Sequence, residues 1–410
     1  IGFSCYVLAD SYFISIAKGA DGLTALNLVM PLYSIIFSIG EMIGVGSAIR
    51  YAISKIKKDA DADDYFWNAL IWCILSSMLF VFAGIFFSAD IMRVLGADEH
   101  IVAVGNNYTK IFMCFAPMFM CNYVTNAFVR NDGAPGIAMS ATLFSSLFNI
   151  VFDYILMFPM NLGMEGAALA TALSPIIGMG ICSIHFFSKK SSVRLVVCKP
   201  SVRKLVAGSQ LGVSAFVGEM SSAVITLAFN FVILKLAGNV GVAAYGVVAN
   251  IAIVTTAVFN GVAQGSQPLI SSCFGRGDKD GCTQLKRMGY TTAFVLAAVM
   301  YSILFIFAGQ FVAVFNSEGS EMLRLYATEG VKLYFIGIFF AGINIVGGGA
   351  FSATEDAFKA AVVSVARGFV LILGAVFVMS ALFGMTGVWL AYAVAEGITT
   401  FIMLVMVLRV

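Results

Sequence analysis

Charged side chains are scarce in this sequence. Asp, Glu, Lys and Arg make up 11% of the 410 residues, whereas a soluble domain carries about 25%. Hydrophobic residues make up 60%, and the mean hydropathy is +0.96. The composition excludes an ordinary soluble fold and predicts a membrane protein with many helical spans. The net charge of +2 gives no indication of a nucleic-acid partner.

Patterns for metal binding, disulfides and hydrolysis are also lacking. The eight cysteines form no C-x-x-C pair, and the two histidines, His100 and His185, are isolated. No H-E-x-x-H or nucleophile pattern occurs. Residues 275–278 spell the G-x-G-D of intramembrane aspartyl proteases, but they lie in a polar loop beside Lys279, which favours a turn. We therefore expect neither an enzyme nor a cofactor.

Most of the sequence consists of apolar segments that are long enough to cross a membrane as helices. The sequence predicts an all-α membrane protein with twelve transmembrane helices. Six fall in an N-lobe at 1–187 and six in a C-lobe at 207–410, and a polar linker at 188–206 joins the lobes. They lie at about 1–17, 24–52, 65–89, 104–129, 136–158, 164–187, 207–236, 241–273, 286–315, 327–352, 358–382 and 386–409. The first segment is shorter than the roughly 20 residues of a span, so we expect the chain to start inside its first helix.

Basic residues are distributed unequally between the two sides of the membrane. If the start of the chain is cytoplasmic, 18 of the 24 Lys and Arg residues fall on that side, which leaves 24 − 18 = 6 on the other. Six of the 18 lie between Ser188 and Lys204. Cytoplasmic loops of membrane proteins carry such an excess. The pattern predicts that both visible ends and the linker are cytoplasmic.

The two halves repeat a sequence pattern. GMEGAALA at 163–170 matches GMTGVWLA at 384–391, and the glycine-rich stretch at 19–25 matches that at 238–244. The pair at 46–47 matches 265–266. An even number of spans in each repeat predicts two parallel lobes, with the substrate site at the seam between them.

Five carboxylates lie well inside predicted spans, where a charge costs about 2.5 to 3.5 kcal/mol on insertion scales. They are Asp10, Glu41, Asp153, Glu219 and Glu396. No Lys or Arg is expected deep enough to pair with them. Each is therefore expected to be protonated, hydrogen-bonded, hydrated or coordinated to a mobile cation, and for the set we favour a coupling-ion role over a structural one.

The strongest candidate pattern is Asn149 with Asp153, because residues one helical turn apart face the same way. Together with Asp10 and Thr171 they provide two carboxylates, an amide oxygen and a hydroxyl. These hard oxygen ligands suit Na⁺ or, with one carboxylate protonated, H⁺. Glu41 either lines a cleft for a cationic substrate or forms a hydrogen bond with the backbone of a neighbouring helix.

For Glu396 we favour a structural role.

Several motifs resemble those of the multidrug and toxic compound extrusion (MATE) transporters, in the bacterial MepA-like branch. The resemblance covers essentially the whole chain. Its motifs are DSYFI at 10–14, GADGL at 19–23, NIVFDY at 149–154, GAALAT at 166–171, GEM at 218–220, AAYGVVAN at 243–250 and GSQPLIS at 265–271.

The resemblance implies a cation site in the N-lobe. Its residues are Asp10, Asn149, Asp153 and Thr171, with the Ala167 carbonyl. Glu219 resembles a C-lobe acid, but the acid expected in the tenth span is absent, and only the amide of Asn344 occurs there.

The implied activity is secondary active efflux from the bacterial inner membrane. Inward movement of Na⁺ or H⁺ would drive rocker-switch export of amphipathic, often cationic, organic molecules by a functional monomer in contact with membrane lipid. Two alternatives remain open. One is a dedicated exporter of a single natural product, and the other is a lipid-linked saccharide flippase of a related fold, which would favour a cationic cavity.

Overall fold

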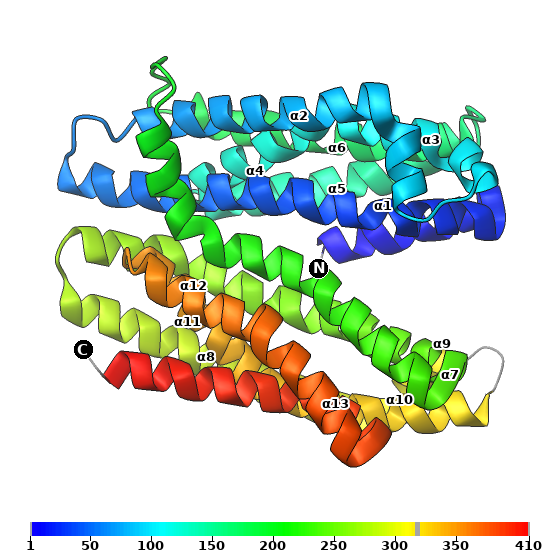
Figure 1. Ribbon diagram of the computed structural model, residues 1–410. Helices are drawn as coiled ribbons and strands as arrows, with labels where there is room; N and C mark the ends of the chain where they lie inside the picture. Colours follow the sequence, from blue (N-terminus) through cyan, green and yellow to red (C-terminus); the bar gives the residue numbers. More distant parts are fainter. Residues whose placement is uncertain (1, 316–319, 409–410) are drawn as a thin grey trace. The chain divides into compact units, whose positions relative to one another are not determined.

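The structure, a computed structural model, describes residues 2–315 and 320–408 of the chain. Within these residues it is built of helices joined by turns and loops and contains no strand (Figure 1). The predicted all-α fold is therefore confirmed. The helices are α1 (Gly2–Lys57), α2 (Asp64–Val94), α3 (Glu99–Cys114), α4 (Ala116–Asn131), α5 (Pro135–Met157), α6 (Gly163–Phe186), α7 (Val202–Gly275), α8 (Lys279–Ile306), α9 (Ala308–Phe315), α10 (Glu321–Tyr334), α11 (Ile338–Ala353), α12 (Ala357–Val365) and α13 (Leu371–Leu408), with short turns η1 (Phe335–Gly337) and η2 (Ala366–Val370).

Three long helices are interrupted by a glycine at which the chain turns back, as Figure 1 shows. The breaks lie at Gly19 in α1 (φ 61°), Gly238 in α7 (φ 61°) and Gly384 in α13 (φ 58°). Gly163, where α6 begins, has a φ of 52°. A positive φ is accessible to glycine without the strain that a Cβ adds. These four glycines form two pairs of the sequence repeat, so the repeat encodes equivalent turns.

The helices account for the twelve predicted spans. Eight described helical stretches are long and apolar enough to cross a membrane, and the bent pair of α3 and α4 makes a ninth. Dividing α7 at Gly238 and α13 at Gly384, and adding the segment before Gly19, gives twelve within the described part of the chain. The α3–α4 pair bends by 45° next to Pro117, in the first turn of α4, because proline removes a backbone donor.

The chain forms two compact units, residues 1–216 and 217–410. In the first unit, α5 and α6 approach closely at Gly166, where a Cβ would come within 2.9 Å of the Leu156 carbonyl oxygen. Tyr33 of α1 stacks on Phe112 of α3, with ring centroids 3.6 Å apart. These contacts place α1, α3, α5 and α6 around a common interior.

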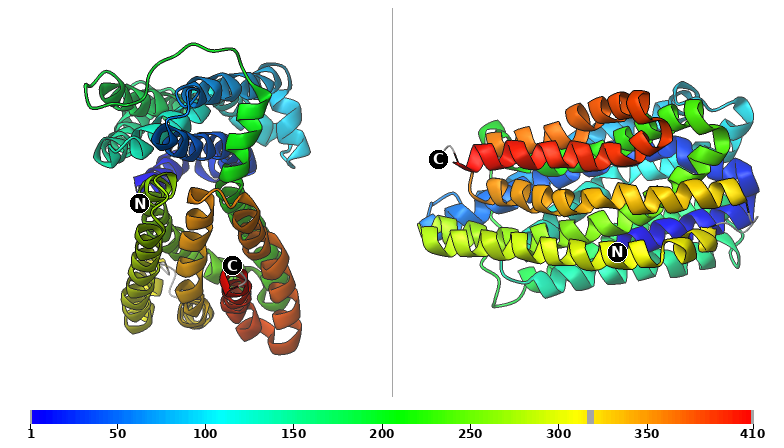
Figure 2. Two further views of the ribbon diagram at one scale, coloured as in Figure 1. Left: turned by 90° about the vertical axis from the view of Figure 1, so that its left-hand side faces the viewer. Right: turned by 90° about the horizontal axis from the view of Figure 1, so that it is seen from below.

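In the second unit, aromatic side chains of α7, α10 and α13 form the core. Tyr334 stacks on Tyr392 with centroids 4.3 Å apart, and Phe229 stacks on Tyr245 at 4.9 Å. Trp389 is fully buried among them. After its break at Gly384, α13 runs back past its own first half (Figure 2), which brings Tyr392 and Glu396 into the unit's interior.

The predicted linker lies in the first unit and is fixed there by Asp132, between α4 and α5. The buried Asp132 carboxylate accepts hydrogen bonds from His185 (2.8 Å), the Ser191 hydroxyl (3.1 Å) and the Ser192 backbone N–H (2.9 Å). Burial raises the pKa of Asp132, but the hydrogen bonds from Ser192, His185 and Ser191 outweigh it and hold that pKa below its ordinary value. The linker is therefore docked on the first unit.

Candidate cation site

The centre of the candidate site is one face of α5. Asn149, Asp153 and Met157 follow one another at intervals of one helical turn, and all three are buried. Asn149 and Asp153 are completely inaccessible to solvent. An apolar helix that buries an amide and a carboxylate together needs polar partners for both, and α1, α3 and α6 provide them.

Thr171 of α6 contacts the Asn149 side chain. In the amide orientation that satisfies both ends, the Asn149 nitrogen donates to Asp153 Oδ2 at 3.2 Å. The amide oxygen then accepts from the backbone N–H and the hydroxyl of Thr171, each at 3.2 Å. Ala167 is buried one turn before Thr171 on the same helix. Asn149 thus connects the carboxylate of α5 to α6.

Asp10 of α1 contributes the second carboxylate, and only 5% of this residue is exposed. It lies near enough to Asp153 for the two carboxylates to interact electrostatically. The Tyr108 hydroxyl of α3 hydrogen bonds with the Asp10 carboxylate, and it also hydrogen bonds with the Tyr33 hydroxyl. Tyr108 and Tyr33 are not predicted from the sequence, because nothing in their spacing distinguishes them from the other 12 of the 14 tyrosines.

Each of the two carboxylates has one oxygen without a hydrogen-bond donor. Asp10 Oδ1 and Asp153 Oδ1 are both buried, and no described residue donates to either. Two like charges that interact in a buried site cannot both remain without compensation. A cation between the oxygens, or a proton on one carboxyl group, supplies that compensation. The predicted residues Asp10, Asn149, Asp153 and Thr171 are therefore brought together in a form suited to either ion.

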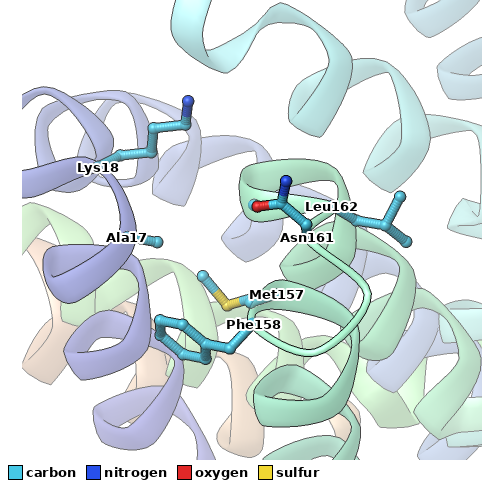
Figure 3. A pocket seen from close by; sticks show the side chains of 7 residues that line it. Ala17, Lys18, Met157, Phe158, Asn161 and Leu162 are labelled. Carbon is cyan, nitrogen blue, oxygen red and sulfur yellow. The ribbon is translucent and has the colours of Figure 1, made fainter.

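A polar hollow lies one turn beyond Asp153 in the first unit. It has a volume of about 440 Å³ and is lined by α1 and by the turn between α5 and α6 (Figure 3). Met157 lines it and Lys18 stands at its edge, as the close-up shows. Met157 also lies one helical turn after Asp153 on the same face of α5, so the hollow and the candidate site share this helix face.

The other predicted acids lie elsewhere. Glu41 of α1 is half-buried, and its carboxylate interacts electrostatically with Arg130 at the end of α4. Glu219, on α7, is also half-buried and belongs to the second unit. For Glu41, the expectation that no basic residue pairs with the buried acids therefore stays a prediction.

The same expectation is wrong for Glu396. Its carboxylate forms an ion pair with Arg367 of η2, with Nη2 2.7 Å from Oε1. Asn344 of α11 donates to the other oxygen, Oε2, at 2.6 Å. Arg367 was expected on the cytoplasmic side, at the predicted span 358–382, and therefore without a buried partner. The paired geometry agrees with the structural role favoured for Glu396.

The remaining sequence patterns have local explanations. Asp278 of the G-x-G-D stretch begins α8, where its side chain accepts a hydrogen bond from the Gly281 N–H at 2.8 Å. This is an ordinary helix N-cap. His100 contacts Asp21 at 3.0 Å on the surface, and the side-chain hydrogen bond raises the pKa of His100.

Comparisons with known proteins agree with this architecture. The MatE family model matches residues 1–155 and 215–378. The multidrug export protein MepA of Staphylococcus aureus strain MRSA252 is 27% identical over 405 residues, which cover 96% of this chain and 87% of that protein. MepA of Staphylococcus saprophyticus is 26% identical over 400 residues, with the same coverage.

Solved transporter structures share the fold. An outward-facing MATE family transporter of the MOP superfamily superposes with a TM-score of 0.92 at 20% identity, over 100% of this chain and 92% of that one. A MOP superfamily transporter from Pyrococcus furiosus gives 0.90 at 20% identity, over 99% and 91%. By its family match and its twelve-span helical fold, the chain belongs to the MATE family of membrane transporters.

Proposed function

We propose that this chain is a secondary active efflux antiporter. Inward movement of Na⁺ or H⁺ through the site of Asp10 and Asp153 drives export of an amphipathic, often cationic, organic molecule. The relatives named multidrug export protein support the direction and breadth of transport. The antiporter works as a monomer surrounded by lipid in the bacterial cytoplasmic membrane, with both visible ends of the chain on the cytoplasmic side.

The single observation that carries the proposal is the pair of buried carboxylates. Asp10 and Asp153 interact electrostatically, and each has one oxygen without a donor from the described residues. A group that only stabilises a fold is normally satisfied when buried. An incompletely satisfied pair instead suits an ion that binds and leaves in each cycle.

Coupling follows from differential affinity. Asp10 lies on α1, Asn149 and Asp153 on α5, and Thr171 on α6. A cation between them favours the arrangement of these helices in which all four groups converge, and its release favours another. If substrate binds better to one of the two arrangements, the two binding events are linked. Ion and substrate need not touch. Rocking between the two arrangements is the rocker-switch form of alternating access.

Transport by purified protein in liposomes tests the proposal. The probe is ethidium, a lipophilic organic cation, with a Na⁺ gradient or a pH gradient imposed separately. We expect at least one gradient to accelerate ethidium movement against its own concentration. A rate of ethidium movement that is unchanged by both the Na⁺ gradient and the pH gradient would contradict ion coupling. A deletion strain that accumulates one endogenous compound, with unchanged ethidium retention, would point to a dedicated exporter.

A further inference from the structure

A second buried polar cluster lies inside the second unit, around Glu396 of α13. Asn344 Nδ2 donates to Glu396 Oε2 at 2.6 Å and to the Glu396 backbone carbonyl at 2.9 Å. The Thr400 hydroxyl, one turn after Glu396, donates to Asn344 Oδ1 at 3.0 Å. All three residues are at most 9% exposed. A carboxylate, an amide and a hydroxyl therefore meet, as in the first unit.

The two clusters have the same ligand types. In the first unit, Asp153 and Asn149 share a helix and Thr171 comes from the next one. In the second unit, Glu396 and Thr400 share α13 and Asn344 comes from α11. Hard oxygen donors of this kind suit a small monovalent cation or a proton.

The clusters differ in their fourth member. The first unit adds the carboxylate of Asp10, whereas the second adds the guanidinium of Arg367. Arg367 Nη2 and Nε donate to Glu396 Oε1 at 2.7 and 3.0 Å. Both Glu396 oxygens therefore have donors, in contrast to Asp10 and Asp153.

The backbone holds Arg367 in this position. Arg367 lies in η2, a single π-helical turn between α12 and α13, and such a turn changes the direction of the side chains that follow the helix. The next residue, Gly368, packs directly on Ser221 of α7, where a Cβ would come within 2.6 Å of the serine Cβ. The contact fixes η2 against α7 and so fixes Arg367 over Glu396.

The other titratable groups facing the cluster are tyrosines. Tyr392 of α13 interacts with both Arg367 and Glu396, and Tyr334 of α10 interacts with Glu396. Tyr245 of α7 interacts with these two tyrosines. Tyrosine is neutral at neutral pH, so among the residues that the structure describes only Arg367 and Glu396 bring charge to the cluster. An arginine cannot lose its proton in a protein.

We propose that Arg367 is a resident cation that fills a latent ion site made by Glu396, Asn344 and Thr400. Its permanent charge excludes Na⁺ and H⁺ from the second unit and confines coupling to the Asp10 and Asp153 pair. This inference rests on the proposed ion-coupled function. Removal of the Arg367 charge turns Glu396 into a carboxyl group that takes up a proton or a monovalent cation.

Infrared difference spectroscopy of the purified protein between acidic and alkaline pH tests this. Each carboxyl group that titrates adds a band from its protonated C=O. Arg367→Met is expected to show one more such band than the unchanged protein. The band should shrink on addition of Na⁺ at fixed pH and should vanish in Arg367→Met with Glu396→Gln.

Two results overturn the inference. One is a folded Arg367→Met variant with the same spectrum as the unchanged protein. The other is loss, in the double variant, of a band that the unchanged protein shows, because Glu396 would then titrate despite Arg367. If Arg367→Met does not fold, the double variant Arg367→Met with Glu396→Gln decides the question. The inference requires that this variant show every band of the unchanged protein. Failure of the proposed function gives a different result. In that case Asp10→Asn and Asp153→Asn would remove no band from the spectrum of the unchanged protein, because neither carboxyl group would titrate.

Discussion

The two units treat buried acids in opposite ways. In the first unit, the carboxylates of Asp10 and Asp153 interact electrostatically, and each has an oxygen with no donor among the described residues. In the second, Glu396 is neutralised by Arg367 and hydrogen-bonded by Asn344. Burying a charge is tolerable when the charge is paired and hydrogen-bonded. The difference is the one that the proposed coupling at Asp10 and Asp153 requires: the acid of the second unit is neutralised within the protein, and the acids of the first unit are not fully hydrogen-bonded.

The largest expected effect follows from neutralising the first pair. Asp153→Asn keeps the side-chain volume but removes the charge, so we expect export to fall to the background of cells without the protein, while membrane insertion is retained. Ethidium efflux at matched expression measures it. Asp280→Asn, an exposed carboxylate at the start of α8, is the matched control. Normal efflux by Asp153→Asn would remove the site from the coupling mechanism.

The second effect concerns the paired acid. Glu396→Gln leaves the Arg367 charge buried without its partner, which costs about 3 to 5 kcal/mol of folding stability. Arg367→Met should cost less, because a carboxyl group can take up a proton whereas arginine cannot release one. Thermal unfolding in detergent compares the two with the double variant, which should recover most of the loss. Equal losses from both single changes would argue against a permanent charge pair.

A smaller effect is expected at the edge of the cation site. Tyr108→Phe removes the hydroxyl that hydrogen bonds with Asp10, and a hydrogen bond of about 1 kcal/mol corresponds to about 5-fold in affinity. Na⁺ affinity from calorimetric titration should fall by that factor. Tyr154→Phe on α5, more than half exposed, serves as control. An unchanged affinity in Tyr108→Phe would place Tyr108 outside the site.

The smallest effect lies in the docked linker. Because the pKa of Asp132 is lowered on folding, its contribution is present above the unfolded pKa of about 3.9 and is lost as pH falls through the folded value. Asp132→Asn should release the linker at neutral pH. The release should be measurable as faster backbone hydrogen exchange at Ser192 and Val193. A cysteine introduced at Ser192 should react with an impermeant thiol reagent from the cytoplasmic side only. Labelling of a cysteine at Ser192 from outside intact cells would contradict the topology.

The sequence predicted much of the fold because span length and small-residue turns are local properties. It also predicted the convergence of Asp10, Asn149, Asp153 and Thr171, through the family motifs and the helical spacing of Asn149 and Asp153. Tyr108 was missed because a contact between α3 and α1 leaves no local pattern.

Arg367 was missed for a different reason. Its direction depends on the π-helical turn η2, which hydrophobic periodicity does not reveal. The sequence does contain a signal for the polar cluster itself, because Asn344, Glu396 and Thr400 repeat the ligand types of the first unit.

The central claim is that Asp10, Asn149, Asp153 and Thr171 bind Na⁺ in competition with H⁺. Isothermal titration of purified protein with Na⁺ over a range of pH tests it most directly, with Asp10→Asn and Glu219→Gln as the paired variants. We predict affinity that strengthens as pH rises, no binding in Asp10→Asn, and near-normal binding in Glu219→Gln. Binding that persists in Asp10→Asn and disappears in Glu219→Gln would contradict the claim and place the coupling ion in the second unit.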